Sequence, residues 1–295
     1  MNFRILTNSF RLIALLAVIS LSSCKKESGS NSNDASAGNL SDSSTAADNM
    51  YYDVLNNAFV GFSDNSTVWN ASSLHAEKTT TFSLDGEHTT NLGCAIYTIS
   101  DSVPGEYPKT LTLDFGTGCT SADGILRKGK LIYVFTAPIV VPGATASVTF
   151  NQYVVNGFGL QGAYSITNNS SDQNGISFTT QVTNGIITYP NATNYHYSHN
   201  KTYVMTAGSG TPYDITDDVY SITGNSSFST AGGASLVFTS KTPLVKAVSC
   251  HNVSSGVVDF VYNNSVSGSI DFGNGDCDNL ATVTVGSWNK TVILR

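Results

Sequence analysis

The chain has 295 residues, of which 12% are charged, and its formal net charge is −7. This length supports one large domain or two small ones, and the low content of charged residues excludes a coiled coil. Because 21 acidic residues stand against 14 basic ones, the chain is not expected to bind nucleic acid.

Residues 1–23 have the pattern of a secretory signal peptide. Arg4 and Arg11 supply positive charge, and the apolar run at 12–19 is too short to span a bilayer. The tetrad Leu-Ser-Ser-Cys that ends at Cys24 resembles the lipobox of bacterial lipoproteins. This resemblance implies that the chain is cut before Cys24 and that acyl chains such as palmitate on Cys24 anchor the protein in a membrane.

Residues 24–45 are rich in Ser, Asn, Asp, Gly and Ala and have little to bury, which predicts a flexible tether. In enteric bacteria, an Asp directly after the acylated Cys retains a lipoprotein in the inner membrane. Lys25 stands at that position here, so the resemblance implies the outer membrane, on either its periplasmic or its cell-surface face.

The segment 46–60 predicts one short amphipathic helix. Met50, Val54, Leu55 and Ala58 follow helical spacing, and Ser44 or Thr45 can cap the first turn.

From residue 61 to residue 295 the pattern is that of an all-β domain. Short runs rich in Val, Ile, Thr, Tyr and Phe alternate with Gly, Asn and Pro, and no helical segments lie between them. The expected architecture is an antiparallel meander, with a barrel, a sandwich and a curved sheet all left open. The predicted strands are 110–115, 130–136, 146–155, 159–167, 176–188, 195–206, 219–223, 235–240, 257–262, 268–272, 281–285 and 291–294.

Beyond Cys24 the chain has four cysteines, which allow three pairings. Cys250 and Cys277 are equidistant from the turn residues Asn263 and Asn264, so a two-residue hairpin would place them opposite each other. By the same argument Cys94 and Cys119 flank a turn centred on residues 106–107. Two local disulfides are therefore predicted. A zinc site is not favoured, since no Cys-x-x-Cys spacing occurs and an exported chain meets an oxidising compartment.

Each predicted hairpin ends in a similar motif, Asp-Phe-Gly-Thr-Gly-Cys at 114–119 and Asp-Phe-Gly-Asn-Gly-Asp-Cys at 271–277. The segments DFGTGCTSADGILRKGK, DDVYSITG and IDFGNGDCDNLATVTVG resemble a family of uncharacterised Bacteroidetes lipoproteins. The resemblance implies location and class, and it implies no activity.

No motif in the chain predicts a catalytic residue, a metal site or a cofactor. The Asp-Phe-Gly at 114–116 lacks the other kinase motifs, and Asn274, Asp276 and Asp278 lack the Gly and the closing Glu of a calcium loop. His196 and His199 would lie on opposite faces of a strand, which does not favour joint metal binding.

One strand carries a candidate binding stripe. Alternate positions there hold aromatic and basic side chains, whose flat rings and polar tips suit a glycan or a protein surface. The alternative is that these rings pack beneath other parts of the chain. The stripe consists of Tyr195, Tyr197, His199, Lys201 and Tyr203.

These observations together predict a lipid-anchored outer-membrane protein. Its leading expected function is non-enzymatic binding of an extracellular partner, such as a glycan or a protein, through an exposed sheet face. A hydrolase with an unrecognised site and a passive coat protein are the alternatives.

Overall fold

The computed structural model describes residues 32–63, 79–83, 94–100, 106–173, 175–211 and 215–294. These residues form one long helix, α1 (Ser32–Ser63), one short 3₁₀ helix, η1 (Ile215–Asp217), and a single sheet of 16 strands. The strands are β1 (Thr79–Ser83), β2 (Ile96–Ser100), β3 (Lys109–Asp114), β4 (Cys119–Thr120), β5 (Leu126–Phe135), β6 (Thr145–Val155), β7 (Phe158–Asn168), β8 (Ser177–Thr188), β9 (Asn194–Ala207), β10 (Val219–Thr230), β11 (Ser235–Ser240), β12 (Leu244–Ala247), β13 (Ser255–Tyr262), β14 (Val266–Asn274), β15 (Leu280–Val285) and β16 (Trp288–Ile293).

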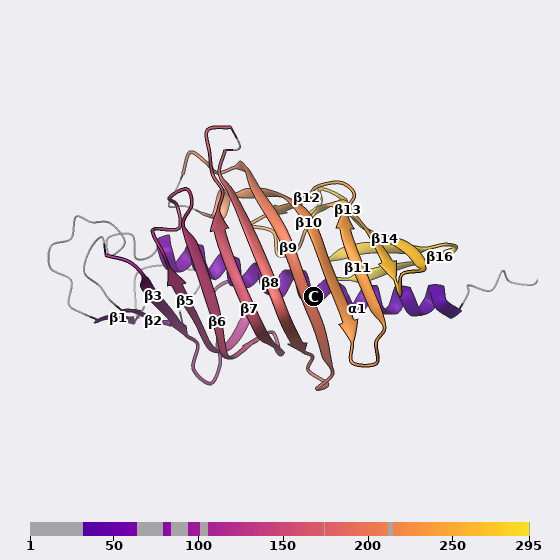
Figure 1. Cartoon of the computed structure of the whole chain (residues 1–295), viewed down its shortest axis with the longest axis horizontal. Coiled ribbons are helices and arrows are strands. Elements are labelled where there is room, and N and C mark those ends of the chain that lie inside the picture. The colour runs from indigo at the N-terminus through magenta and orange to yellow at the C-terminus, as the bar shows by residue number, and fades with distance from the viewer. Residues whose placement is uncertain are drawn as a thin grey trace, which may run out of the picture.

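The sheet is an antiparallel meander, as predicted. Almost every strand pairs with its neighbours in the chain, while the short β4 pairs β5, and β12 pairs both β10 and β13. Each of the twelve predicted strands overlaps an observed one, whereas β1, β2, β4 and β12 were not predicted. Helix α1 crosses behind the long central strands (Figure 1), so one face of the sheet packs on the helix.

Bulges on adjacent strands bend the sheet around α1. The register shifts near Gly129 in β5, between Val148 and Val154 in β6, near Gly162 in β7 and near Gly185 in β8. Gly162 has a φ of 119°, and a Cβ built there would lie 2.7 Å from the Cα of Gly185. Bulges increase strand twist and bending, so a row of them curves the sheet over the helix.

The helix is longer than the sequence predicted, and the predicted tether is partly wrong. α1 begins at Ser32, so residues 32–45 are helical, while residues 24–31 lie outside the described residues. Small side chains make this possible, because the hydroxyls of Ser41 and Ser44 donate to the carbonyls of Gly38 and Ser41 at 2.9 and 2.7 Å. Buried serines satisfied in this way let the helix lie close to the sheet.

C-terminal strands hold this first half of α1. The ring of Trp288 in β16 lies against Gly38, and Lys290 forms an ion pair with Asp42 at 2.8 Å. Farther along, Leu111 packs close to Gly61. The helix is thus buried from its first turns almost to its last. None of the described helices is both long enough and apolar enough to cross a membrane.

Both predicted disulfides, Cys94–Cys119 and Cys250–Cys277, are present. The predicted hairpin registers are wrong by small shifts. Tyr262 pairs with Val266, which makes a three-residue turn, and β2 pairs with β3 in a register that does not place Cys94 opposite Cys119. The bridges form nevertheless, because the cysteines lie beyond the paired ends of these hairpins, and Cys119 belongs to β4.

Replacing Gly38 with Ala tests whether the first half of α1 is docked. In a free helix Ala would add about 1 kcal/mol of stability over Gly. In this structure the new Cβ would lie 2.4 Å from the Trp288 ring, so Gly38→Ala should lower the free energy of unfolding by roughly 1–3 kcal/mol. Urea unfolding measures the change, with the exposed Asn39→Ala as control. A Gly38→Ala protein more stable than wild type would contradict docking.

Candidate functional site

The predicted binding stripe on β9 faces α1 and not the solvent. Tyr197, His199, Lys201 and Tyr203 are buried, and Tyr195 is half-buried with its ring stacked on Phe228. The alternation was predicted correctly, since these side chains do share one face. The prediction that they form an exposed recognition surface is wrong, because the helix covers that face.

Asp48 of α1 is the centre of the polar contacts beneath the helix. Lys201 forms an ion pair with it at 2.7 Å, and the Tyr197 hydroxyl donates to the same carboxylate oxygen. The Tyr51 ring stacks on Tyr197 with centroids 5.1 Å apart. Burial acts to raise the pKa of Asp48, but the charge of Lys201 and the hydrogen bonds from Lys201 and Tyr197 outweigh it, so the pKa is lowered.

His199 is held as a neutral imidazole. Burial, and then the charge of Lys201, lower its pKa from 6.5 to about 3, although Asp48 opposes this shift. Because the Tyr197 hydroxyl donates to Asp48, it can only accept from Nδ1 of His199, 3.1 Å away. Nε2 then accepts from the Thr180 hydroxyl at 2.9 Å. Both ring nitrogens are therefore satisfied without a positive charge.

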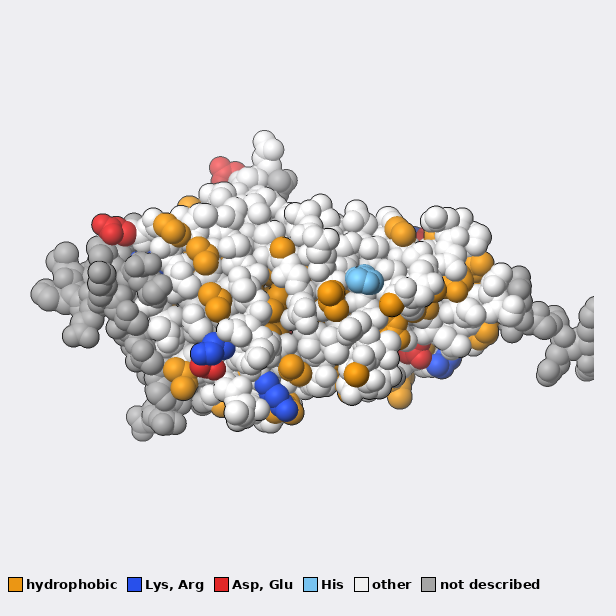
Figure 2. Space-filling model, turned by 60° about the horizontal axis from the view of Figure 1, so that its bottom comes forward, with side chains coloured by type: hydrophobic (Ala, Val, Ile, Leu, Met, Phe, Trp, Pro, Cys, Tyr) orange, Lys and Arg blue, Asp and Glu red, His pale blue; other side chains and the backbone are white. Residues whose placement is uncertain are grey.

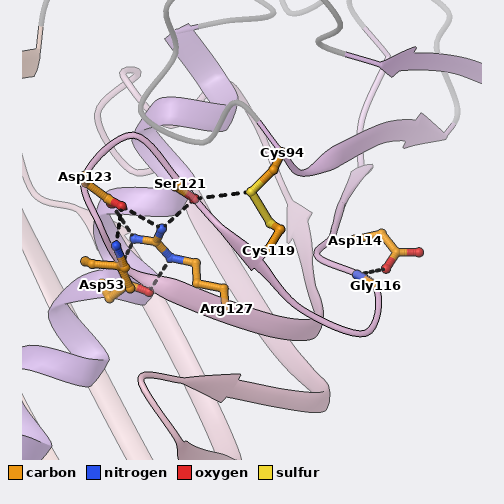
Figure 3. Close-up of a disulfide and its surroundings, with 9 residues drawn as sticks. Asp53, Cys94, Asp114, Gly116, Cys119, Ser121, Asp123 and Arg127 are labelled. Atoms are coloured by element: carbon orange, nitrogen blue, oxygen red, sulfur yellow. Dashed lines mark hydrogen bonds and ion pairs between the residues drawn. A yellow bond between two sulfur atoms is a disulfide. The ribbon is translucent and has the colours of Figure 1, made fainter.

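A second buried pair ties α1 to β5. The guanidinium of Arg127, whose side chain is fully buried, binds both carboxylate oxygens of Asp53 (Figure 3). It also binds Asp123 at 2.8 Å and the Ser121 hydroxyl at 2.9 Å. The Tyr153 hydroxyl donates to Asp53 at 2.6 Å. Such an Arg pair is bidentate and fully hydrogen-bonded, as a buried charge requires.

Asp53 and Asp123 do not form an acid–base pair. Each of their four oxygens accepts a hydrogen bond from Arg127, so both carboxylates are bound to the same cation. The geometry therefore gives no support to a hydrolase built on these two carboxylates. Among the described residues, no group of three or more His, Cys, Asp or Glu side chains could hold a metal ion.

The opposite face of the same strands carries the candidate surface. Between β6 and β11, the only formally charged residue within a strand is Lys201, which points toward the helix. We call the outward side chains of β6–β11 the uncharged face. It consists mainly of Thr, Ser, Asn and Gln side chains, and His196 lies on it.

Strand register aligns these polar side chains into rows. One row runs Thr145, Thr167, Thr179, Thr202 and Thr223, with each residue paired to the next across β6–β10. The next row runs from β6 to β11 through Ser147, Ser165, Gln181, Asn200, Asn225 and Thr239. Neighbouring strands lie about 4.8 Å apart, so each row presents hydroxyl or amide groups at that spacing.

The rows contain few strong internal bonds. The Thr179 and Thr202 hydroxyls of the first row are 3.4 Å apart, and elsewhere on the uncharged face the Ser198 and Ser227 hydroxyls are 2.7 Å apart. Exposed Asn200 has no side-chain hydrogen bond within the described part of the chain. In the view of Figure 2, charged side chains lie toward the margins, and the middle is uncharged with scattered hydrophobic groups. The surface thus offers many hydrogen-bond donors and acceptors and no ionic group.

Comparisons with known proteins assign no family to this chain. Protein-family models, curated proteins and solved structures all gave no match. The resemblance to Bacteroidetes lipoproteins therefore stays a prediction. Cys24, the predicted lipidation residue, lies outside the described residues.

The neutral His199 predicts loss of stability in mild acid. In the unfolded chain histidine takes up a proton near pH 6.5, whereas the folded protein does not until about pH 3. The free energy of unfolding should therefore fall as pH drops below 6.5, by about 2 kcal/mol at pH 5. His199→Gln, which keeps one donor and one acceptor, should flatten this dependence, and exposed His196→Gln should not. Urea unfolding at pH 7 and pH 5 measures both, and equal slopes in the two variants would contradict a neutral buried imidazole.

Proposed function

We propose that this protein is a lipid-anchored, non-enzymatic binding protein of the cell envelope, and that its uncharged face binds a neutral, hydroxyl-rich polysaccharide. The observation that carries the proposal is the absence of Asp, Glu, Lys and Arg from the outward positions of six adjacent strands, β6–β11. This replaces the buried β9 stripe as the location of the binding surface.

The chemistry of the face matches that of a neutral glycan. Hydroxyl and amide groups both donate and accept hydrogen bonds, as sugar hydroxyls do. Removing water from a charged side chain without a partner is costly, and this face has no such side chain to desolvate. A polyanion or a nucleic acid would find no cation here, and the negative net charge of the chain would repel it.

The compartment is supported independently. Two disulfides join cysteines that are 25 and 27 residues apart, and such bonds indicate an oxidising, extracytoplasmic environment. The lipobox at residues 21–24 supports an anchor at Cys24, and Lys25 supports the outer membrane. An anchored protein with a polysaccharide-binding surface would hold that polymer close to the membrane.

A charge inserted into the uncharged face should weaken polysaccharide binding. The full mature chain is run in native gels that contain starch, a β-glucan, a mannan or the anionic alginate. We expect retardation by at least one neutral polymer and none by alginate. Asn200→Lys, in the middle of the face, should weaken retardation about tenfold or more, because a hydrated ammonium would have to lose water.

The matched control is Ser267→Lys, an exposed position on β14 outside the face. Its retardation should equal that of wild type. If no neutral polymer retards the protein, or if both lysine variants behave alike, the proposal fails.

Replacing Cys24 with Ser tests the anchor. Cells that express the wild-type chain should incorporate radiolabelled palmitate into it and carry it in the membrane fraction. Cys24→Ser should lose the label and leave the membrane fraction, because only a thiol is acylated in this way. A variant that keeps both properties would exclude an anchor at this residue.

A further inference from the structure

A pocket of about 100 Å³ lies beside α1, between the helix and two segments that flank it. Asn49, Tyr52 and Asn56 of α1 form its floor. One wall is the turn between β4 and β5, which contains Asp123, and the other is the segment after β12, which contains His251. We call it the clamped pocket.

Each wall is fixed by a disulfide. Cys119 begins the strand that leads into the first wall, and it is bonded to Cys94 (Figure 3). Cys250 lines the second wall and is bonded to Cys277. The second wall is also tied to the floor, since the Asn49 side chain donates to Asn252 at 2.7 Å. A pocket with both walls held in this way is preformed, which lowers the ordering cost of binding.

The first wall carries an excess negative charge. Asp53 and Asp123 both line the pocket, and they share the single cation Arg127. Two carboxylates with one guanidinium leave a net charge of about −1 at this wall. The side chain of Asp123 is 23% exposed, so it is accessible from the pocket.

The second wall carries a positive charge, that of Lys246. Lys246 forms no ion pair among the described residues, and its ammonium donates to the carbonyls of Ala247 and Cys250 and lies 4.4 Å from the centre of the Tyr52 ring. Burial lowers the pKa of Lys246 to about 8, although the charge of Asp53 opposes this shift, and an anionic group placed beside the ammonium would favour its charged form further. His251 is exposed at the same wall.

Between the walls the lining is largely apolar. Met50, Ile125, Val155 and Val248 contribute to it, while the side chain of Asn56 has no hydrogen-bond partner among the described residues. A ligand that fits must therefore have a cationic end, an anionic end and a small apolar part.

We infer that the clamped pocket binds a zwitterion of the size of a free amino acid, with the ammonium at Asp123 and the carboxylate at Lys246. The apolar lining takes the aliphatic side chain, and Asn56 supplies one further hydrogen bond. This site lies on α1 and the adjacent loops, so it is independent of the uncharged face on β6–β11.

Titration calorimetry of the full mature chain tests the assignment with four probes. L-leucine carries both charges, 4-methylpentanoate lacks its ammonium, 3-methylbutylamine lacks its carboxylate, and glucose carries neither. We expect leucine to bind at least about tenfold more tightly than each of the other three, which corresponds to 1.4 kcal/mol. Equal binding of leucine and either singly charged analogue overturns the assignment. So does the absence of leucine binding at a leucine concentration on the order of 10 mM, which is about ten times a millimolar Kd.

Two variants locate the charges. Lys246→Met and Asp123→Asn should each weaken leucine binding about tenfold or more. The control is Lys241→Met, which breaks only the exposed ion pair with Asp259, and it should bind leucine as wild type does. Because Lys246 is buried, its variant is checked by thermal unfolding. Asp123→Asn leaves the Arg127–Asp53 pair in place and keeps the test valid if Lys246→Met does not fold. Wild-type affinity in Asp123→Asn overturns the proposal.

Discussion

The structure depends on burying a polar helix inside a curved sheet. α1 carries Asp53, which is buried, and Asp48, which is partly buried, on the sides that face the sheet, and removing a charge from water without a partner is costly. The sheet therefore has to place Lys201 and Arg127 opposite them. Those two pairs set how the helix is rotated and how far it is shifted along β5 and β9. The stacked rings around Tyr51 then fill the space between the two pairs.

Local patterns predicted the strands and the disulfide pairing, because alternation and sequence proximity are local properties. They did not predict residues 32–45 as helix, since a run of Ser, Asn and Ala has little to bury and its serines are satisfied only once the helix exists. The β9 stripe shows a different limit. Alternation tells which side chains share a face, but tyrosine, histidine and lysine fit both a solvated face and a core with polar partners. The stripe is buried because Asp48 of α1 supplies its polar partner, and Asp48 lies some 150 residues away in the chain.

The uncharged face had a sequence signal that hydrophobic patterning does not detect. Six successive strands contain only Lys201 as a charged residue, and this absence of charge is a property of composition that hydrophobic alternation does not report. The cross-strand rows of threonine needed the register, which the bulges in β5–β8 shift. The clamped pocket could not be predicted at all, because its floor and its two walls come from three distant segments.

The start of α1 at Ser32 has a mechanical consequence. Only seven residues lie between Cys24 and Ser32, and the eight Cα–Cα steps that join the two span at most about 28 Å in a fully extended chain. Tension applied through the proposed anchor at Cys24 would therefore reach the first turn of the helix across this short segment. α1 is held at successive points along its length by Trp288, by Lys290 and by the ion pairs of Asp48 and Asp53. A force along the helix axis would therefore act on all of these contacts at once, and they would not break one after another. The helix would thus distribute a force applied at its N-terminus over the strands that contact it.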